Sequence, residues 1–169
     1  MLGIVIPTYN RPQHLFVLLE FFSSIKNNSW FELIILDNSS DFNVADLIAI
    51  YQARLNIILS ISEVNTGDME SNIARLGHIP EFEIDRYCFM WVLGDDDLPK
   101  RDSLDLLYIK LQMGPQCLIF GRCLSRLGER QLAQDRSYSF QSFDHYFRTV
   151  VECNIFDSLA CLLYTSPSP

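Results

Sequence analysis

The chain has 169 residues, of which 49% are hydrophobic and 20% charged, a composition typical of one folded globular domain. Its formal net charge of −8, with no basic stripe anywhere in the sequence, argues against a nucleic-acid partner, because phosphate binding needs a basic face. No apolar run reaches the roughly 20 residues that a membrane-spanning helix requires.

The cysteines and the N-terminus indicate a compartment. The five cysteines form no Cys-x-x-Cys pair, and several lie in apolar runs, where reduced cysteine behaves as a small hydrophobic residue. The N-terminal "MLGIVIPTYN" has neither the basic flank nor the small-residue cleavage site of a secretory signal. We therefore expect a reducing, cytoplasmic setting.

Short apolar runs alternate with helix-like segments along the chain. Residues 2–6, "LGIVI", predict a strand, and the apolar residues between Pro12 and about Lys26 recur at the three- and four-residue spacing of a helix. The alternation continues, with strands expected at 31–37, 55–62, 88–93 and 117–125, and helices at 43–54, 68–76 and 99–111. Such alternation predicts an α/β fold with a parallel sheet and helices on both faces.

Polar residues follow three of these strands where the strands end. They are "PTYNR" (7–11), "DNSS" (37–40) and "GDDD" (94–97). The carboxyl ends of parallel strands meet at one edge of a sheet, which is where ligands bind in such folds. Asp, Asn and Ser are also ordinary turn and cap residues, and this second interpretation is the better one for "DNSS" taken alone.

The "GDDD" segment places Asp95, Asp96 and Asp97 next to one another. Three adjacent carboxylates raise one another's pKa unless a cation or hydrogen-bond donors lie between them. Hard oxygen ligands of this kind suit Mg²⁺ or Mn²⁺, which proteins hold through one or two carboxylates together with substrate phosphates. A solvated acidic turn that caps the helix near Pro99 is the alternative, and the segment alone does not separate the two.

Four phrases occur in order along the chain: "IVIPTYNRPQHL", "LIILDNSS", "NTGDMESNIAR" and "WVLGDDDLP". Together they resemble the N-terminal, nucleotide-sugar half of a family 2 glycosyltransferase, over about residues 2–110. Each motif alone is weak evidence for the resemblance, whereas the four motifs in this order are specific to it. The resemblance implies the GT-A fold, a Rossmann-like and mostly parallel sheet flanked by helices, here incomplete.

The same resemblance implies site residues. Thr8, Tyr9 and Asp37 would lie in the nucleoside pocket, where Tyr9 offers a ring for base stacking and Asp37 accepts hydrogen bonds. Asp95 and Asp97 match the family's Asp-x-Asp motif, with Asp95 near the ribose and both as candidate ligands of Mn²⁺ or Mg²⁺. The whole nucleotide-sugar set is Pro7, Thr8, Tyr9, Arg11, Asp37, Asn65, Gly67, Asp95 and Asp96.

The implied reaction moves a sugar, with inversion, from a nucleoside-diphosphate sugar to a saccharide or lipid-linked saccharide acceptor, in surface polysaccharide synthesis. The enzyme would work in the cytoplasm, with peripheral association at the inner face of the membrane as a further option. A catalytically silent nucleotide-binding or interaction domain on the same fold is the alternative, and a phosphohydrolase that uses "GDDD" is a weaker third.

Several other side chains are weaker candidates. Arg75 could contact the diphosphate or the pocket wall, although a solvated helix face is favoured. Asp144 and Glu152 are the nearest acids for the general base that the reaction needs, and for both a helix surface is favoured. The histidines show no metal-ligand spacing; they are His14, His78 and His145.

Residues 161–169, "CLLYTSPSP", change the composition abruptly. They resemble the translation of a transposase adapter used in sequencing libraries, and a natural Ser/Pro-rich tail is the alternative. We therefore expect a partial glycosyltransferase domain at 1–160 and a non-native tail at 161–169, with the catalytic base beyond the fragment. Such a fragment would bind nucleotide without turning it over.

Overall fold

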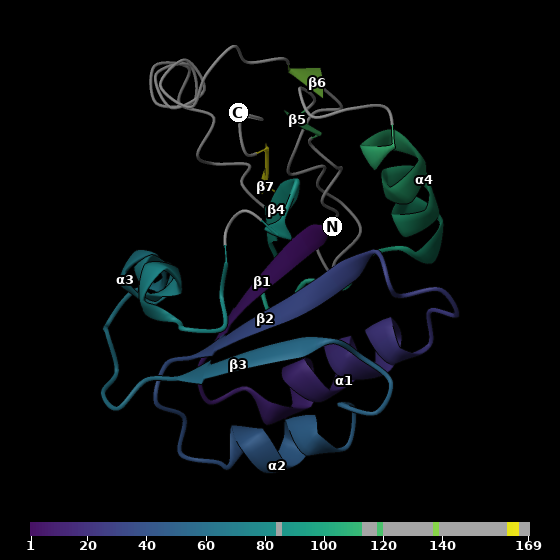
Figure 1. Ribbon diagram of the computed structural model, residues 1–169. Helices are drawn as coiled ribbons and strands as arrows, with labels where there is room; N and C mark the ends of the chain where they lie inside the picture. The colour runs from purple at the N-terminus through teal and green to yellow at the C-terminus, as the bar shows by residue number, and fades with distance from the viewer. Residues whose placement is uncertain (84–85, 113–117, 120–136, 139–161, 166–169) are drawn as a thin grey trace, which may run out of the picture.

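A computed structural model describes residues 1–83, 86–112, 118–119, 137–138 and 162–165. Its centre is a five-stranded sheet in the order β3-β2-β1-β4-β7 (Figure 1). The first four strands are parallel, as the sequence predicts, and β7 runs antiparallel to β4. The strands are β1 (Leu2–Thr8), β2 (Phe31–Asp37), β3 (Ile57–Ile61), β4 (Phe89–Val92) and β7 (Leu162–Thr165).

The register brings the carboxyl ends of three strands together. β1 pairs with β2 from Leu2↔Phe31 to Thr8↔Asp37, so that these two strands end side by side. On the other side of β1, the backbone N–H of Leu93 donates to the carbonyl of Val5 at 2.9 Å, just past the end of β4. The loops that follow β1, β2 and β4 therefore start from the same edge of the sheet.

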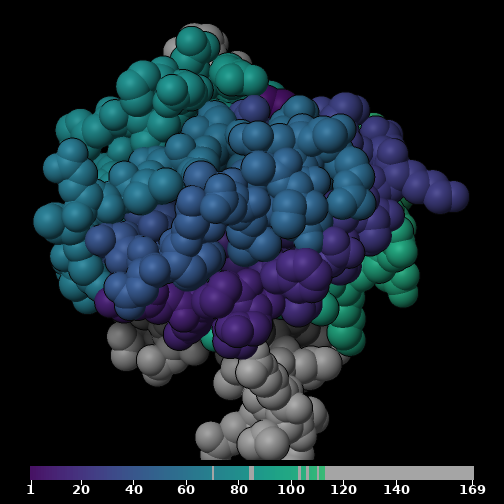
Figure 2. All heavy atoms as spheres, turned by 90° about the horizontal axis from the view of Figure 1, so that it is seen from below, coloured from purple at the N-terminus to yellow at the C-terminus, as the bar shows by residue number. Residues whose placement is uncertain are grey.

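Helices cover both faces of the sheet. Apolar residues of α1 (Pro12–Ser23), α2 (Val44–Ala49) and α4 (Arg101–Leu111) share one buried cluster with one face of β1, β2 and β4. The other face packs against α3 (Met69–Ala74) and the 3₁₀ turn Arg75–His78. Figure 1 shows α1 and α2 below the sheet, and Figure 2 views that side, with α2 in blue beside the purple N-terminal residues.

Most helices end earlier than the sequence pattern predicts. The first ends at Ser23 and not near Lys26, because the hydroxyls of Ser23 and Ser24 bond back to the carbonyls of Glu20 and Phe21. The third, expected to reach Leu76, changes at Arg75 into the 3₁₀ turn. Among the described residues, every helix is too short or too polar to cross a membrane.

The strand expected at 117–125 does not join the parallel sheet where the structure describes it. β5 (Leu118–Ile119) pairs antiparallel with β6 (Ser137–Tyr138) in a separate two-stranded sheet. The expectation that this run extends the parallel sheet is therefore wrong for Leu118 and Ile119. The reason is that β7 already occupies the free edge of β4.

Candidate functional site

The acidic segment after β4 forms a tight turn. The backbone N–H of Asp97 donates to the carbonyl of Gly94 at 3.0 Å, which closes the turn. A Cβ atom at Gly94 would lie 3.0 Å from Oδ2 of Asp97 and 3.1 Å from Oδ1 of Asp96. Both carboxylates therefore fold back over Gly94, and a larger residue at position 94 would crowd them.

Asp95 points the other way, toward the loop that follows β1. Its carboxylate is only 5% exposed and accepts from Oγ1 of Thr8 at 2.8 Å and from Nη1 of Arg11 at 3.0 Å. The same nitrogen of Arg11 lies 3.2 Å from Oδ2 of Asp96. The hydrogen bond and the charge of Asp95 raise the pKa of Arg11 above its ordinary value. The structure thus joins "PTYNR" to "GDDD" through buried and half-buried contacts.

Asp97 lies in an environment that disfavours its own charge. Burial raises the pKa of Asp97, and the charges of Asp96 and Asp95 raise it further, partly offset by a hydrogen bond from the backbone of Gly94. A cation at this turn would relieve that repulsion. Within the described part of the chain, no three His, Cys, Asp or Glu side chains are arranged as a metal site. A cation here would therefore need oxygens from a substrate or water to complete its shell.

The "DNSS" loop after β2 is fixed from both sides. The buried carboxylate of Asp37 accepts from the backbone N–H of Ser40 at 3.1 Å and from its hydroxyl at 2.5 Å. The backbone N–H of Asn38 donates to the carbonyl of Thr8 at 2.9 Å. Asn10 and Asp41 exchange two further hydrogen bonds, of 2.9 and 2.7 Å. The loops after β1 and β2 are therefore bound to each other.

Asn38 extends this network to a third loop, at Asn65–Gly67. Its side chain donates to Oδ1 of Asn65 at 3.1 Å and accepts from the backbone N–H of Thr66 at 2.8 Å. Oδ1 of Asn65 also accepts from the N–H of Gly67 at 2.7 Å, and Gly67 has a φ of +87°. Sequence reasoning treated Asn38 only as a turn residue, and its place directly after Asp37 was the one signal that could have indicated more.

The remaining candidates differ in what surrounds them. Tyr9 is 44% exposed directly after β1, so its ring is accessible at this edge. Pro7 is half-buried within β1. His14 lies in α1 and His78 in the 3₁₀ turn. The other weak candidates lie outside the described residues; they are Asp144, His145 and Glu152.

Arg75 does not lie on a solvated helix face, so that expectation is wrong. Its Nη1 atom donates to the carbonyl of Asp37 at 2.9 Å and to Oδ1 of Asn72 at 2.8 Å. Its Nη2 atom donates to Oγ of Ser60 at 2.8 Å. The side chain is therefore turned inward, over the ends of β2 and β3.

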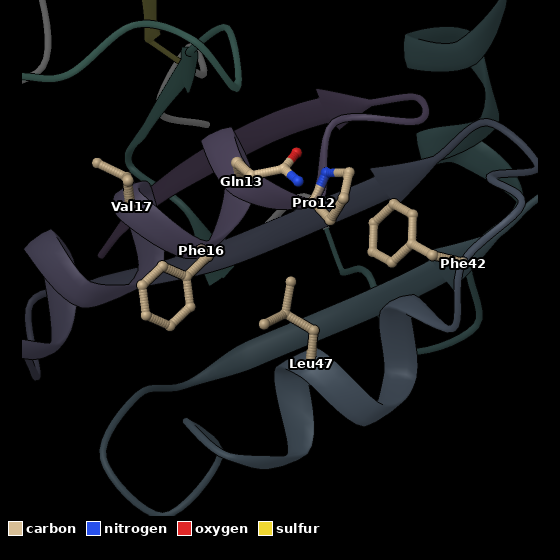
Figure 3. Close-up of a pocket in the computed structure, with 6 residues that line it drawn as sticks. All are labelled: Pro12, Gln13, Phe16, Val17, Phe42 and Leu47. Carbon is tan, nitrogen blue, oxygen red and sulfur yellow. The ribbon is translucent and has the colours of Figure 1, made fainter.

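An apolar pocket of about 350 Å³ lies between α1 and α2. Figure 3 shows the side chains that line it: Pro12, Gln13, Phe16, Val17, Phe42 and Leu47. These residues include none of the candidates for nucleotide or metal binding. The pocket is thus separate from the polar site in its lining and in its chemistry.

No family model matches the sequence. The chain is similar to the abequosyltransferase RfbV of Salmonella typhimurium, with 32% identity over 113 residues. This alignment covers 63% of the chain and 31% of RfbV, so the chain spans about a third of that relative's length.

Solved structures match a larger share of the chain. The match to S. aureus TarS 1–349, in complex with UDP-GlcNAc, covers 79% of this chain and 37% of the TarS chain, with a TM-score of 0.63 and 18% identity. The match to the mannosyltransferase PcManGT from Pyrobaculum calidifontis, in complex with GDP-Man and Mn²⁺, covers 76% of this chain and 36% of the PcManGT chain. Its TM-score is 0.56, with 17% identity. The chain has the GT-A fold. The resemblance to GT-A glycosyltransferases that the motifs indicate is therefore confirmed.

Proposed function

We propose that this GT-A chain is the donor-binding part of an inverting, metal-dependent glycosyltransferase. It would move a sugar from a nucleoside-diphosphate sugar to a saccharide or lipid-linked saccharide acceptor, in surface polysaccharide synthesis. The observation that carries the proposal is the Gly94–Asp97 turn, which Thr8 and Arg11 bind to the loop after β1. An abequosyltransferase relative, and structural neighbours with UDP-GlcNAc and with GDP-Man and Mn²⁺, support it.

The nucleoside would bind over the three loops that are bonded to one another. Tyr9 has an exposed ring on which a base can stack. Oδ1 of Asp37 accepts from both the N–H and the hydroxyl of Ser40, whereas Oδ2 accepts only from the N–H and keeps a lone pair for a base or ribose. Asn65 and Gly67 would form the neighbouring wall. Asp96, exposed and paired with Arg11, would face the sugar-phosphate side.

The donor set fits a divalent cation, Mn²⁺ or Mg²⁺. Asp97 and Asp95 would hold it, with Asp97 as the more available ligand because both oxygens of Asp95 already accept hydrogen bonds. When bound, such an ion neutralises charge on the departing diphosphate. Arg11 places a permanent positive charge at the same turn, next to Asp95 and Asp96.

The acceptor half of the reaction needs a general base. We propose that this base lies beyond the described residues, in the part of the enzyme that binds the acceptor. A lipid-linked acceptor would place the enzyme in the cytoplasm at the inner face of the membrane, as a peripheral protein. We also propose that residues 1–160 belong to the glycosyltransferase domain and that residues 161–169 are a non-native tail.

Titration with nucleoside diphosphates, with and without Mn²⁺, tests the proposal. Binding should require the metal, and Asp97→Ala should abolish it, because the most available carboxylate of the turn is lost. Asp105→Ala, an exposed acid on α4, is the matched control and should bind as the unaltered chain does. Binding that ignores the metal, or that survives Asp97→Ala, would refute this function. Metal-dependent binding by a full-length enzyme that transfers no sugar would favour the silent nucleotide-binding domain.

A further inference from the structure

Arg75 reaches the sheet from the opposite side to α1 and α2. It begins the 3₁₀ turn that follows α3, and its guanidinium lies over the carboxyl ends of β2 and β3. Nη1 has two hydrogens, and both are used, one on the carbonyl of Asp37 and one on Oδ1 of Asn72. In the part of the chain that the structure describes, none of its hydrogen-bond partners is a carboxylate.

Asn72 completes the arrangement one helical turn earlier. It is 2% exposed, and its Nδ2 donates to the carbonyl of Leu36 at 2.9 Å. Two consecutive carbonyls of β2, those of Leu36 and Asp37, are therefore bound by side chains from α3 and the turn after it. The carbonyl of Asp37 also accepts from the backbone N–H of Ser62 at 2.9 Å, which fixes the exit of β3 to the same point.

Asp37 and Asn38 are the residues on which the nucleoside side of the site depends. Asp37 is the proposed acceptor for a base or ribose, and Asn38 binds Asn65 and Thr66. Their backbone lies directly after the two carbonyls that Asn72 and Arg75 hold. A shift of that backbone would move the carboxylate and the Asn65–Gly67 loop together.

We propose that Arg75, supported by Asn72, is a positioning residue for the nucleoside half of the donor site. It fixes the end of β2 so that Asp37 and Asn38 hold their loops in a binding geometry, and it does not contact the diphosphate. The part of this inference that concerns nucleotide rests on the proposed function. The part that concerns loop order does not.

The first test uses the chain without ligand. Arg75→Met removes three hydrogen bonds but keeps an unbranched apolar stem. Amide hydrogen exchange at residues 38–40 and 62–67 should become faster by about tenfold or more, whereas exchange in the centres of β1 and β2 should stay unchanged. Arg54→Met, on the exposed segment after α2, is the matched control and should leave both loops unaffected. Unchanged exchange in the Arg75 variant would overturn the proposal, whatever the protein binds.

The second test compares two ligands in the presence of Mn²⁺, a nucleoside diphosphate and inorganic pyrophosphate. Arg75→Met should lower the affinity for the nucleoside diphosphate by about tenfold and change the affinity for pyrophosphate by no more than about twofold, since only the nucleoside contacts depend on β2. Asp97→Ala should lower the affinity for both ligands. Equal weakening of both by Arg75→Met would mean that Arg75 binds phosphate directly, which would overturn the proposal.

Two milder variants guard against a simple folding defect. Arg75→Lys keeps the charge and can still reach one carbonyl, and Ser60→Ala removes only one of the three bonds. Both variants should lose affinity for the nucleoside diphosphate and not for pyrophosphate, by a smaller factor than Arg75→Met. Both should still unfold cooperatively. If neither ligand binds the unaltered chain, the proposed function fails, while the exchange experiment still decides the role of Arg75.

Discussion

Asp95 is a buried charged side chain, and its neighbours explain how the fold tolerates it. A buried carboxylate is costly unless hydrogen-bond donors surround it. Thr8 supplies one donor from the end of β1, and Arg11 supplies a second together with a positive charge. Because Arg11 is half-exposed and Thr8 is buried, solvent can replace part of the arginine contact but not the threonine hydroxyl.

Thr8→Val tests this dependence. The variant keeps the shape of the side chain and removes the donor, so one oxygen of Asp95 is left buried without its partner. We expect the free energy of unfolding to fall by about 1–3 kcal/mol, the usual cost of an unsatisfied buried polar group. Urea unfolding measures it. Thr8→Ser, which keeps the hydroxyl and loses the methyl group, should cost less than Thr8→Val. A Thr8→Val variant as stable as the unaltered chain would show that the hydrogen bond to Asp95 contributes nothing to stability.

At the scale of elements, α3 is short and depends on its first residue. Asp68 is the N-cap, and its carboxylate accepts from the backbone N–H of Ser71 at 2.6 Å and from the Ser71 hydroxyl at 3.0 Å. These two hydrogen bonds lower the pKa of Asp68 below its ordinary value. Since α3 carries Asn72 and precedes Arg75, the cap helps to hold the helix that fixes the end of β2.

The pKa shift of Asp68 predicts a pH dependence. A carboxylate whose pKa is lower in the folded state stabilises the fold above its unfolded pKa and loses that effect as the pH falls through the folded pKa. The unaltered chain should therefore lose stability faster than Asp68→Asn between about pH 5 and about pH 2, because asparagine can cap without titrating. Urea midpoints across this range provide the measurement. Parallel pH profiles for the two proteins would contradict the prediction.

The elements were predictable from the sequence to different degrees. The strands β1, β2 and β4 could be placed because each is an apolar run that stops at a polar or glycine residue, and the shared edge of the sheet followed from their alternation with helices. Asn38 and Arg75 could not be assigned in this way. Asn38 binds Thr66, 28 positions away in the chain, and Arg75 binds the carbonyl of Asp37, 38 positions away. These contacts depend on strand register and on how α3 packs, and residue spacing alone does not reveal either.

At the scale of the whole molecule, the parallel sheet has two different edges. β3 lies at one end of the order, and at the other end β4 is covered by β7. β4 is the short apolar strand "FMWV", and all four of its residues pair with Leu162–Thr165. An apolar strand with an unpaired edge is a template for pairing with another chain. The pairing with β7 therefore protects the strand that leads into the acidic turn.

Removal of residues 161–169 tests what this pairing does. The pairing is made by the backbone, so it can protect β4 whether or not the segment is native, and the truncated chain should self-associate through the freed edge of β4. Sedimentation velocity over a range of concentrations should show dimers or larger species for residues 1–160, at concentrations at which the unaltered chain sediments as a smaller species. A matched control replaces Leu162–Thr165 with Val-Thr-Val-Thr, which has high strand propensity and should restore the behaviour of the unaltered chain. If residues 1–160 sediment as the unaltered chain does, β7 does not protect the edge of β4 from pairing with another chain.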